Sequence, residues 1–148
     1  MKKTIAIIGC GNLGSAIAKG ILEKSSDKYN VIATRNKVEL LTPLQALGVE
    51  VSNNNIDAVA KSEIILLAVK PYLVATILNE IKNVLNPAKV LVSLATGITI
   101  ADMKLILGDT IPVLRAMPNT ATGVGESLTC LCSSDSNSEK RIGEGKNL

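Results

Sequence analysis

The stretch TIAIIGCGNLGSAIAKG (residues 4–20) decides the fold. It begins with an aliphatic run, typical of a buried strand, that ends at Gly9, Gly11 and Gly14 in the spacing G-x-G-x-x-G. A helical pattern follows from Leu13 to Lys24. In such a strand–turn–helix unit the first glycine permits the tight turn, the second lets the backbone approach a pyrophosphate, and the third allows helix and strand to pack closely. The stretch therefore predicts the phosphate-binding turn of a dinucleotide-binding domain; a turn with a purely structural role is the alternative.

The same alternation of short aliphatic runs and helical patterns continues along the chain. Further strands are predicted at residues 30–34, 49–52, 63–69, 89–94, 111–117 and 127–133, and helices at 38–47, 56–61, 72–85 and 99–108. This order predicts an α/β fold of the Rossmann type, a doubly wound, mainly parallel sheet with helices on both faces. We assign residues 1–135 to this nucleotide-binding domain and residues 136–148 to a polar tail or an incomplete last helix.

Local signals predict where two of the helices begin and end. Pro43 interrupts the helical pattern of residues 38–47, so we expect a helix to restart there with Thr42 as its cap. Thr99 and Asp102 have the spacing of a capping box, which opens a helix that Gly108 should end.

Composition limits the classes of function. The 148 residues are 47% hydrophobic and 20% charged, which fits one ordinary domain with a real core. The net charge of +3 is spread along the chain, and a basic cluster with stacking aromatic residues is absent, so nucleic acid is not an expected partner. No apolar run approaches the length of a membrane span. Three cysteines fit a reducing cytoplasm, and the lack of histidine excludes a histidine general base and most zinc sites, so no metal site is expected.

The end of the second predicted strand indicates which dinucleotide is preferred. An NAD enzyme places Asp or Glu here to accept hydrogen bonds from the adenosine ribose, and that carboxylate would repel a 2′-phosphate. This chain carries Thr34, Arg35 and Asn36 instead, which remove the repulsion and supply a hydroxyl, a guanidinium and an amide as donors. The sequence therefore predicts NADP(H) rather than NAD(H); a solvated surface arginine is the alternative.

Three later strand ends carry polar or flexible segments. They are LLAVKP with Lys70, SLATG with Gly97, and RAMPNTATGVG at residues 115–125. Ligands of open parallel sheets bind at the carboxyl ends of the strands, so the three segments should meet in one crevice, the last of them beside the nicotinamide. For Lys70 alone, an ordinary solvated lysine is the alternative.

These segments together resemble a known family. GCGNLGSAIAKG, ATRN, LAVKP, VSLATGIT and LRAMPNTATGVGE occur in the order and spacing of the N-terminal domain of pyrroline-5-carboxylate reductase, and the resemblance extends from residue 1 to about residue 135. It implies an NADP-dependent oxidoreductase that reduces 1-pyrroline-5-carboxylate, a small-molecule substrate, to proline with NADPH, the last step of proline biosynthesis.

The resemblance also implies roles for individual residues. It assigns the pyrophosphate to Gly9, Gly11, Asn12, Leu13 and Gly14, the 2′-phosphate to Thr34, Arg35 and Asn36, the adenosine side to Asn55, the ribose region to Ala68, Val69, Lys70 and Pro71, and the nicotinamide end to Ala95, Gly97, Met117, Pro118 and Asn119. Asn119 and Thr120 would lie nearest the substrate, and no catalytic residue is assigned. Thr96 and Tyr72 depart from the residues common in the family.

Members of the family continue into a helical domain that builds the dimer and reaches the imine substrate, and no such segment follows residue 135. We therefore expect this chain to carry the cofactor-binding part and to be monomeric or weakly associating. A catalytically silent NADP(H)-binding module and a related NADP-dependent imine or hydroxyacid reductase are the alternatives.

The cysteines carry two further expectations. Cys130 and Cys132 lie two apart on a predicted strand, so they should share a buried face, with a metal or redox pair as the alternative. Alkylation of Cys10, inside the glycine turn, would block entry of the cofactor.

Overall fold

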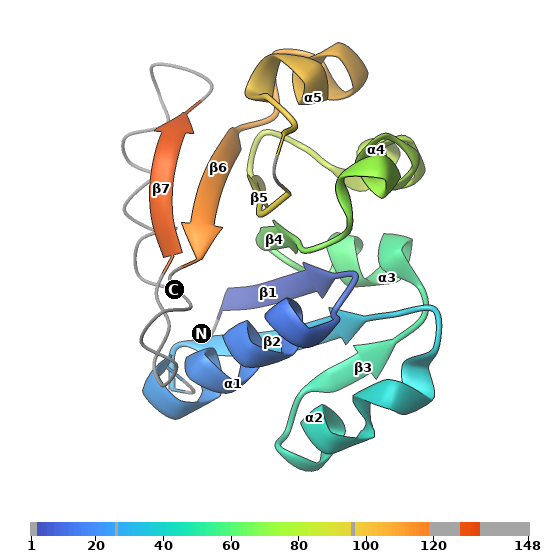
Figure 1. Ribbon diagram of the computed structural model, residues 1–148, viewed down its shortest axis with the longest axis vertical. Coiled ribbons are helices and arrows are strands. Elements are labelled where there is room, and N and C mark those ends of the chain that lie inside the picture. Colours follow the sequence, from blue (N-terminus) through green and yellow to red (C-terminus); the bar gives the residue numbers. More distant parts are fainter. Residues whose placement is uncertain (1–2, 26, 96, 119–127, 134–148) are drawn as a thin grey trace.

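A seven-stranded sheet forms the centre of the computed structural model, which describes residues 3–25, 27–95, 97–118 and 128–133. The strand order is β3-β2-β1-β4-β5-β6-β7 (Figure 1). Neighbouring strands from β3 to β6 are parallel, and β7 is antiparallel to β6. The bounds are β1 Lys3–Ile8, β2 Tyr29–Thr34, β3 Glu50–Ser52, β4 Ile64–Leu67, β5 Val90–Ser93, β6 Val113–Pro118 and β7 Leu128–Ser133.

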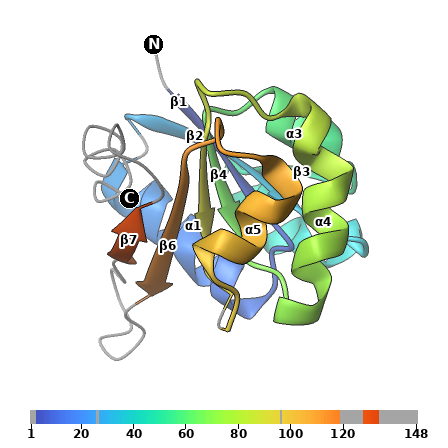
Figure 2. The same cartoon turned by 90° about the horizontal axis from the view of Figure 1, so that it is seen from above.

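Helices cover both faces of the sheet, as Figure 2 shows with α1 on one side and α3 and α4 on the other. Their bounds are α1 Asn12–Ser25, α2 Thr42–Ala46, α3 Asn55–Ala60, α4 Val74–Ile81 and α5 Ile100–Leu107, with 3-10 turns at η1 Val38–Leu41, η2 Pro71–Leu73 and η3 Lys82–Val84. One core cluster joins alternate strand residues such as Ile5 and Ile7 to Ile17 of α1. The second joins Ala6 and Ile8 to α3, α4 and α5. The predicted fold class, a doubly wound and mainly parallel sheet, is confirmed.

The aliphatic runs form these strands because both faces of the sheet are covered. All four residues of β4 and all four of β5 are buried, and so are the last four residues of β1. Parallel strands between two helical layers favour continuous aliphatic runs of this kind over an alternating pattern. In the part of the chain that the structure describes, no helix is both long and apolar enough to cross a membrane.

The capping box at Thr99, the helix end at Gly108 and the new helix at Pro43 are confirmed, whereas the cap at Thr42 is wrong. The capping box of α5 is present, because Thr99 Oγ1 accepts the Asp102 N–H at 3.0 Å and Asp102 Oδ2 accepts the Thr99 N–H at 3.1 Å. Gly108 ends this helix with a φ of +86°. Thr42, however, does not cap α2: it is the first residue of the helix, and its hydroxyl donates to the Glu39 carbonyl at 2.8 Å. Pro43 lies in the first turn of α2, where its missing N–H costs no hydrogen bond.

The strand order reverses between β1 and β4, which are neighbours in the sheet but are not consecutive in the chain. From β1 the chain proceeds outward to β2 and β3, then returns to β4 on the other side and proceeds to β5 and β6. In open α/β sheets, ligands bind at such a reversal, outside the carboxyl ends of the strands. The fold therefore places the glycine turn, which follows β1, at the expected binding crevice.

Candidate nucleotide-binding site

Gly9, which follows β1, packs so closely on Val69, which follows β4, that only glycine fits there. Its φ is +75°, and a Cβ added there would lie 2.3 Å from Val69 Cγ1 and 3.3 Å from Val69 Cα. The two backbone segments are also hydrogen-bonded, because the Ala68 N–H donates to the Ile8 carbonyl at 2.9 Å. The turn after β1 and the segment after β4 are thus packed against each other without room for a side chain on Gly9.

Gly14 and Gly11 have different surroundings. A Cβ at Gly14 would lie 3.0 Å from Ile7 Cγ2 and 3.1 Å from Cys10 Sγ, so glycine lets α1 pack closely on β1. A Cβ at Gly11 would meet no described atom within 4 Å, and the φ of Gly11 is not positive. The fold itself therefore does not demand glycine at position 11. The open space over its backbone fits the close approach of a pyrophosphate.

The amino end of α1 faces this open space. The Ser15 N–H donates to the Gly11 carbonyl at 2.8 Å as the helix begins. The first N–H groups of an α-helix have no partner within the helix and carry a partial positive charge, which suits an anion. The first turn holds no acidic residue, and Leu13 packs its side chain against the core, so Leu13 offers its backbone to a ligand.

Thr34, at the end of β2, is fully buried and its polar atoms are engaged. Its hydroxyl accepts the Gly9 N–H at 3.3 Å and donates to Asn55 Oδ1 at 2.5 Å, and its carbonyl accepts the Cys10 N–H at 2.7 Å. The hydroxyl that we expected to face a phosphate is therefore enclosed by protein. Arg35 and Asn36 are the donors left for a phosphate at this strand end.

Arg35 is partly buried and Asn36 is exposed. The Arg35 N–H donates to the Ser52 carbonyl at 3.1 Å, which continues the ladder between β2 and β3 and fixes the backbone beneath the guanidinium. Arg35 follows β2, the strand next to β1, and its charge offsets part of the rise that burial causes in the pKa of the Cys10 thiol. A contact between Arg35 and a phosphate stays a prediction.

Cys10 lies in the turn with a fully buried side chain. Burial raises the pKa of the thiol above its ordinary value, and the contact with Ser15 and the charge of Arg35 offset this rise only in part. A buried thiol that holds its proton is a poor nucleophile. In this structure Cys10 is therefore protected from the alkylation that we considered from the sequence.

Two of the three asparagines after β3 make different hydrogen bonds. Asn54 caps α3, since its Oδ1 accepts the Asp57 N–H at 3.0 Å, and Ser52 Oγ accepts the Asn54 N–H at 3.0 Å. Asn55, the first residue of α3, reaches back to Thr34. The sequence analysis missed the cap, although an asparagine three residues before an aspartate is a recognisable helix start.

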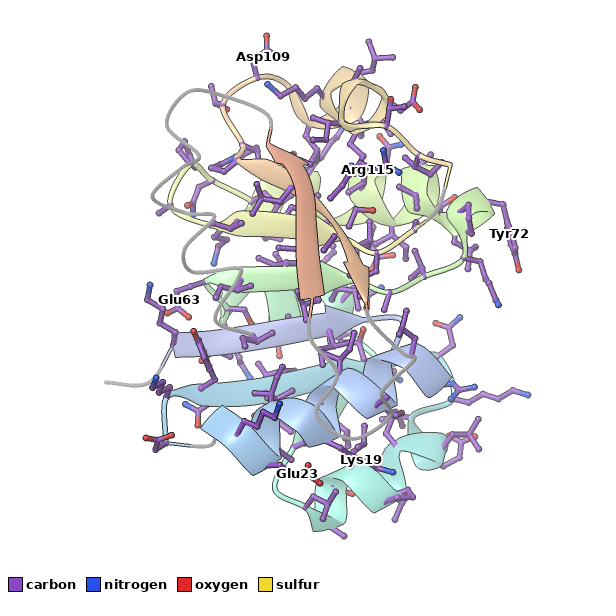
Figure 3. All side chains as sticks on the ribbon, turned by 60° about the vertical axis from the view of Figure 1, so that its left-hand side comes forward. Lys19, Glu23, Glu63, Tyr72, Asp109 and Arg115 are labelled. Carbon is purple, nitrogen blue, oxygen red and sulfur yellow. The ribbon has the colours of Figure 1, made fainter. Side chains whose placement is uncertain are left out.

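The segments after β4 and β5 lie along the same edge of the sheet. The Leu94 N–H donates to the Leu67 carbonyl at 3.0 Å, so the two strand ends stay paired. Val69 is partly buried, whereas Lys70 and Pro71 are exposed where η2 begins. Tyr72 is 79% exposed. Figure 3 shows it at this carboxyl edge, pointing away from the sheet, while Glu63 lies at the opposite edge.

The expected nicotinamide end is described only in part. Ala95 is buried, and its N–H donates to Ser93 Oγ at 3.3 Å. Gly97 is exposed with a φ of +79°. Met117 and Pro118 end β6 opposite Thr129 and Leu128. Asn119, Thr120, Thr96 and the tail at residues 136–148 lie outside the described residues.

Cys130 and Cys132 belong to β7, opposite Ala116 and Arg115, with an irregular register between these two β6 residues. The placement of the two thiol side chains lies outside the described part, so their shared face stays a prediction. Among the described residues, no group of three His, Cys, Asp or Glu side chains is placed to hold a metal ion.

Comparisons with known proteins indicate the family of the chain. A family model described as "NADP oxidoreductase coenzyme F420-dependent" matches residues 4–97. Pyrroline-5-carboxylate reductase 1 of Dictyostelium discoideum is 36% identical over 128 residues, which cover 86% of this chain and 23% of that protein. The pyrroline-5-carboxylate reductase of Haemophilus influenzae is 33% identical over 137 residues, which cover 93% of this chain and 51% of that protein.

A solved structure is similar as well. The crystal structure of Plasmodium falciparum pyrroline carboxylate reductase with NADP bound matches with a TM-score of 0.79 and 26% identity, over 98% of this chain and 54% of that one. The resemblance inferred from the motifs is confirmed. The match covers between 23% and 54% of the length of these relatives.

Proposed function

Because the chain belongs to the NADP oxidoreductase, coenzyme F420-dependent family, and is similar over most of its length to pyrroline-5-carboxylate reductases, we propose that it binds NADP(H) at the carboxyl ends of β1, β2 and β4. The open space over Gly11, at the amino end of α1, is the observation that carries the proposal. It offers room for a pyrophosphate and the first N–H groups of a helix at the reversal of strand order, and Arg35 follows the neighbouring strand β2.

Each part of the cofactor then has protein groups that suit it. The pyrophosphate lies over Gly11 and the first N–H groups of α1, with Gly9 and Gly14 keeping the turn compact. The 2′-phosphate meets Arg35 and Asn36, which offer charge-assisted and neutral hydrogen bonds without a repelling carboxylate. The remaining proposed contacts are Asn12, Leu13, Asn55, Ala68, Val69, Lys70, Pro71, Ala95, Gly97, Met117, Pro118 and Asn119.

We further propose that the reaction served is the reduction of 1-pyrroline-5-carboxylate to proline, with this chain carrying the cofactor-binding part. When bound, NADPH supplies the hydride for the imine carbon. The chain's own contribution is to hold the dinucleotide in one orientation, and the segment around Asn119 and Thr120 borders the substrate. The free thiol of Cys10 supports a reducing compartment such as the cytoplasm.

Two measurements on this chain test the proposal. Calorimetric titration with NADPH should show binding, and a preparation that binds neither NADPH nor NADH refutes the proposed site. Loss of reduced-nicotinamide absorbance with pyrroline-5-carboxylate reports turnover. Binding without turnover would support a silent module, and a preference for other imines or for hydroxyacids would favour the related reductases.

A further inference from the structure

We infer that Thr34 positions the groups that bind the dinucleotide. Its one buried hydroxyl joins the glycine turn to Asn55. This inference rests on the proposed binding of NADP(H). It replaces the direct phosphate contact that the sequence suggested for Thr34 with a contact that acts through its neighbours.

Thr34 connects three segments that are distant in sequence. It ends β2, it accepts two consecutive N–H groups of the turn after β1, from Gly9 at 3.3 Å and Cys10 at 2.7 Å, and it donates to Asn55 at the start of α3 at 2.5 Å. The side chain is fully buried. The relative placement of the pyrophosphate half and the adenosine half of the site therefore depends on this residue.

The hydroxyl also bonds to one end of the Asn55 amide, since Thr34 Oγ1 donates to Asn55 Oδ1. A side-chain amide has an acceptor at one end and donors at the other, and only a partner decides which way it faces. Because Thr34 donates to Oδ1, the Nδ2 group is the end of the partly buried Asn55 side chain that can donate to a ligand. A hydrocarbon in place of the hydroxyl would leave the amide free to turn.

A positioning role and a direct phosphate contact predict different results. A residue that touches the 2′-phosphate affects NADPH alone, because NADH lacks that group. A residue that sets the turn and Asn55 affects both dinucleotides, since both carry the pyrophosphate and the adenosine. We expect Thr34→Val, which keeps the shape and removes the hydroxyl, to weaken NADPH and NADH alike by about tenfold, as for one buried polar group left unpaired.

The experiment measures the dissociation constants of NADPH and NADH for the whole chain, well below its unfolding midpoint. The variants are Thr34→Val, Thr34→Ser, Asn55→Ala and the Thr34→Val/Asn55→Ala double variant. Thr34→Ser keeps the hydroxyl and should bind within about threefold of the wild type even though it loses a buried methyl and some stability. The double variant should bind more tightly than the product of the single effects predicts, because Thr34 acts partly through Asn55.

Several outcomes would overturn the inference. They are a loss for NADPH alone, unchanged binding of both cofactors to Thr34→Val, fully additive effects of Thr34 and Asn55, or a Thr34→Ser variant as weak as Thr34→Val. If Thr34→Val does not fold, Thr34→Ala, which also removes the hydroxyl, takes its place: equal weakening of NADPH and NADH is expected, and a loss for NADPH alone overturns the inference. A wild-type chain that binds neither dinucleotide would refute the proposed function instead.

Discussion

Replacing Gly9 by alanine should destabilise the fold, whereas the same replacement at Gly11 should not. The added Cβ at Gly9 would lie 2.3 Å from Val69 Cγ1, far inside van der Waals contact, and 3.3 Å from the Val69 backbone. A different rotamer of Val69 would therefore relieve only part of the overlap. The positive φ of +75° adds a second penalty, because a side chain rarely adopts it.

The two penalties can be estimated separately. Left-handed backbone costs an L-residue about 1–2 kcal/mol, and overpacking in a well-packed region costs about 1–3 kcal/mol. Gly9→Ala should thus lower the free energy of unfolding by about 2–5 kcal/mol, a large share of the stability of an ordinary domain. With a urea dependence of about 2 kcal/mol per molar, the unfolding midpoint should fall by about 1–2.5 M.

Gly11→Ala is the matched control. No described atom lies within 4 Å of its added Cβ and its φ is not positive, so the folded chain accepts the methyl group. Its stability should change by less than about 1 kcal/mol, and in the favourable direction, because alanine restricts the unfolded chain. Binding of NADPH should nevertheless weaken about tenfold or more, since the methyl group occupies the space proposed for the pyrophosphate.

The assay is urea unfolding followed by far-ultraviolet circular dichroism, because the chain has no tryptophan and only two tyrosines. Calorimetry supplies the binding constants. Equal loss of stability in the two variants would refute the distinction between Gly9 and Gly11. A Gly9→Ala variant as stable as the wild type would contradict the estimate, because neither the overlap with Val69 nor the positive φ would then cost stability. Adding Val69→Ala should restore part of the lost stability but not the part due to φ.

Other perturbations follow from the same structure. Arg35→Asp should weaken NADPH by about tenfold or more while affecting NADH little, and an unchanged preference between the two in calorimetry would refute the role of Arg35. Hydrogen bonds with the backbone and the side chain of Thr99 lower the pKa of Asp102 below its ordinary value of 3.8. The charged carboxylate therefore stabilises the fold above pH 3.8, and this contribution is lost as the pH falls through the lowered pKa. Asp102→Asn should therefore remove part of the acid sensitivity of the urea midpoint, and an identical pH profile would contradict this. Burial raises the pKa of Cys10 above 9.0, so its alkylation in the folded chain should be slow near neutral pH and should speed up in urea, as mass spectrometry of the Cys10 peptide would show.

Features that depend on neighbouring residues were predictable from the sequence. The aliphatic runs and helical patterns gave the order of strands and helices, and the strand predicted at residues 63–69 forms as Ile64–Leu67. The capping box at Thr99 was predictable because its two partners are three residues apart. Thr42 shows the limit of such signals: a hydroxyl next to a helix start can cap the helix or bond to a preceding carbonyl, and the geometry of η1 favours the second.

Contacts between distant segments were beyond the sequence. The need for glycine at position 9 was expected from the turn, but its contact with Val69 depends on β4 lying next to β1. The burial of Thr34 likewise depends on how the start of α3 lies over the end of β2, which no local pattern records. The sequence predicted which segments bind the cofactor, and that assignment stays a prediction. It could not tell which of their side chains are enclosed by protein, as Thr34 is, and which reach the surface.

That distinction separates residues that can change cofactor choice from residues that cannot. At the end of β2, Thr34 is fully buried and holds the turn, whereas Arg35 and Asn36, the next two residues, have side chains that reach the surface. Substitutions at Arg35 and Asn36 can therefore alter which dinucleotide binds while the backbone beneath them stays paired through the Arg35 N–H and the Ser52 carbonyl. A substitution at Thr34 disturbs the turn that both dinucleotides share. Preference for NADP(H) should thus be adjustable through the side chains of Arg35 and Asn36, while affinity for either cofactor should depend on the buried hydroxyl next to them.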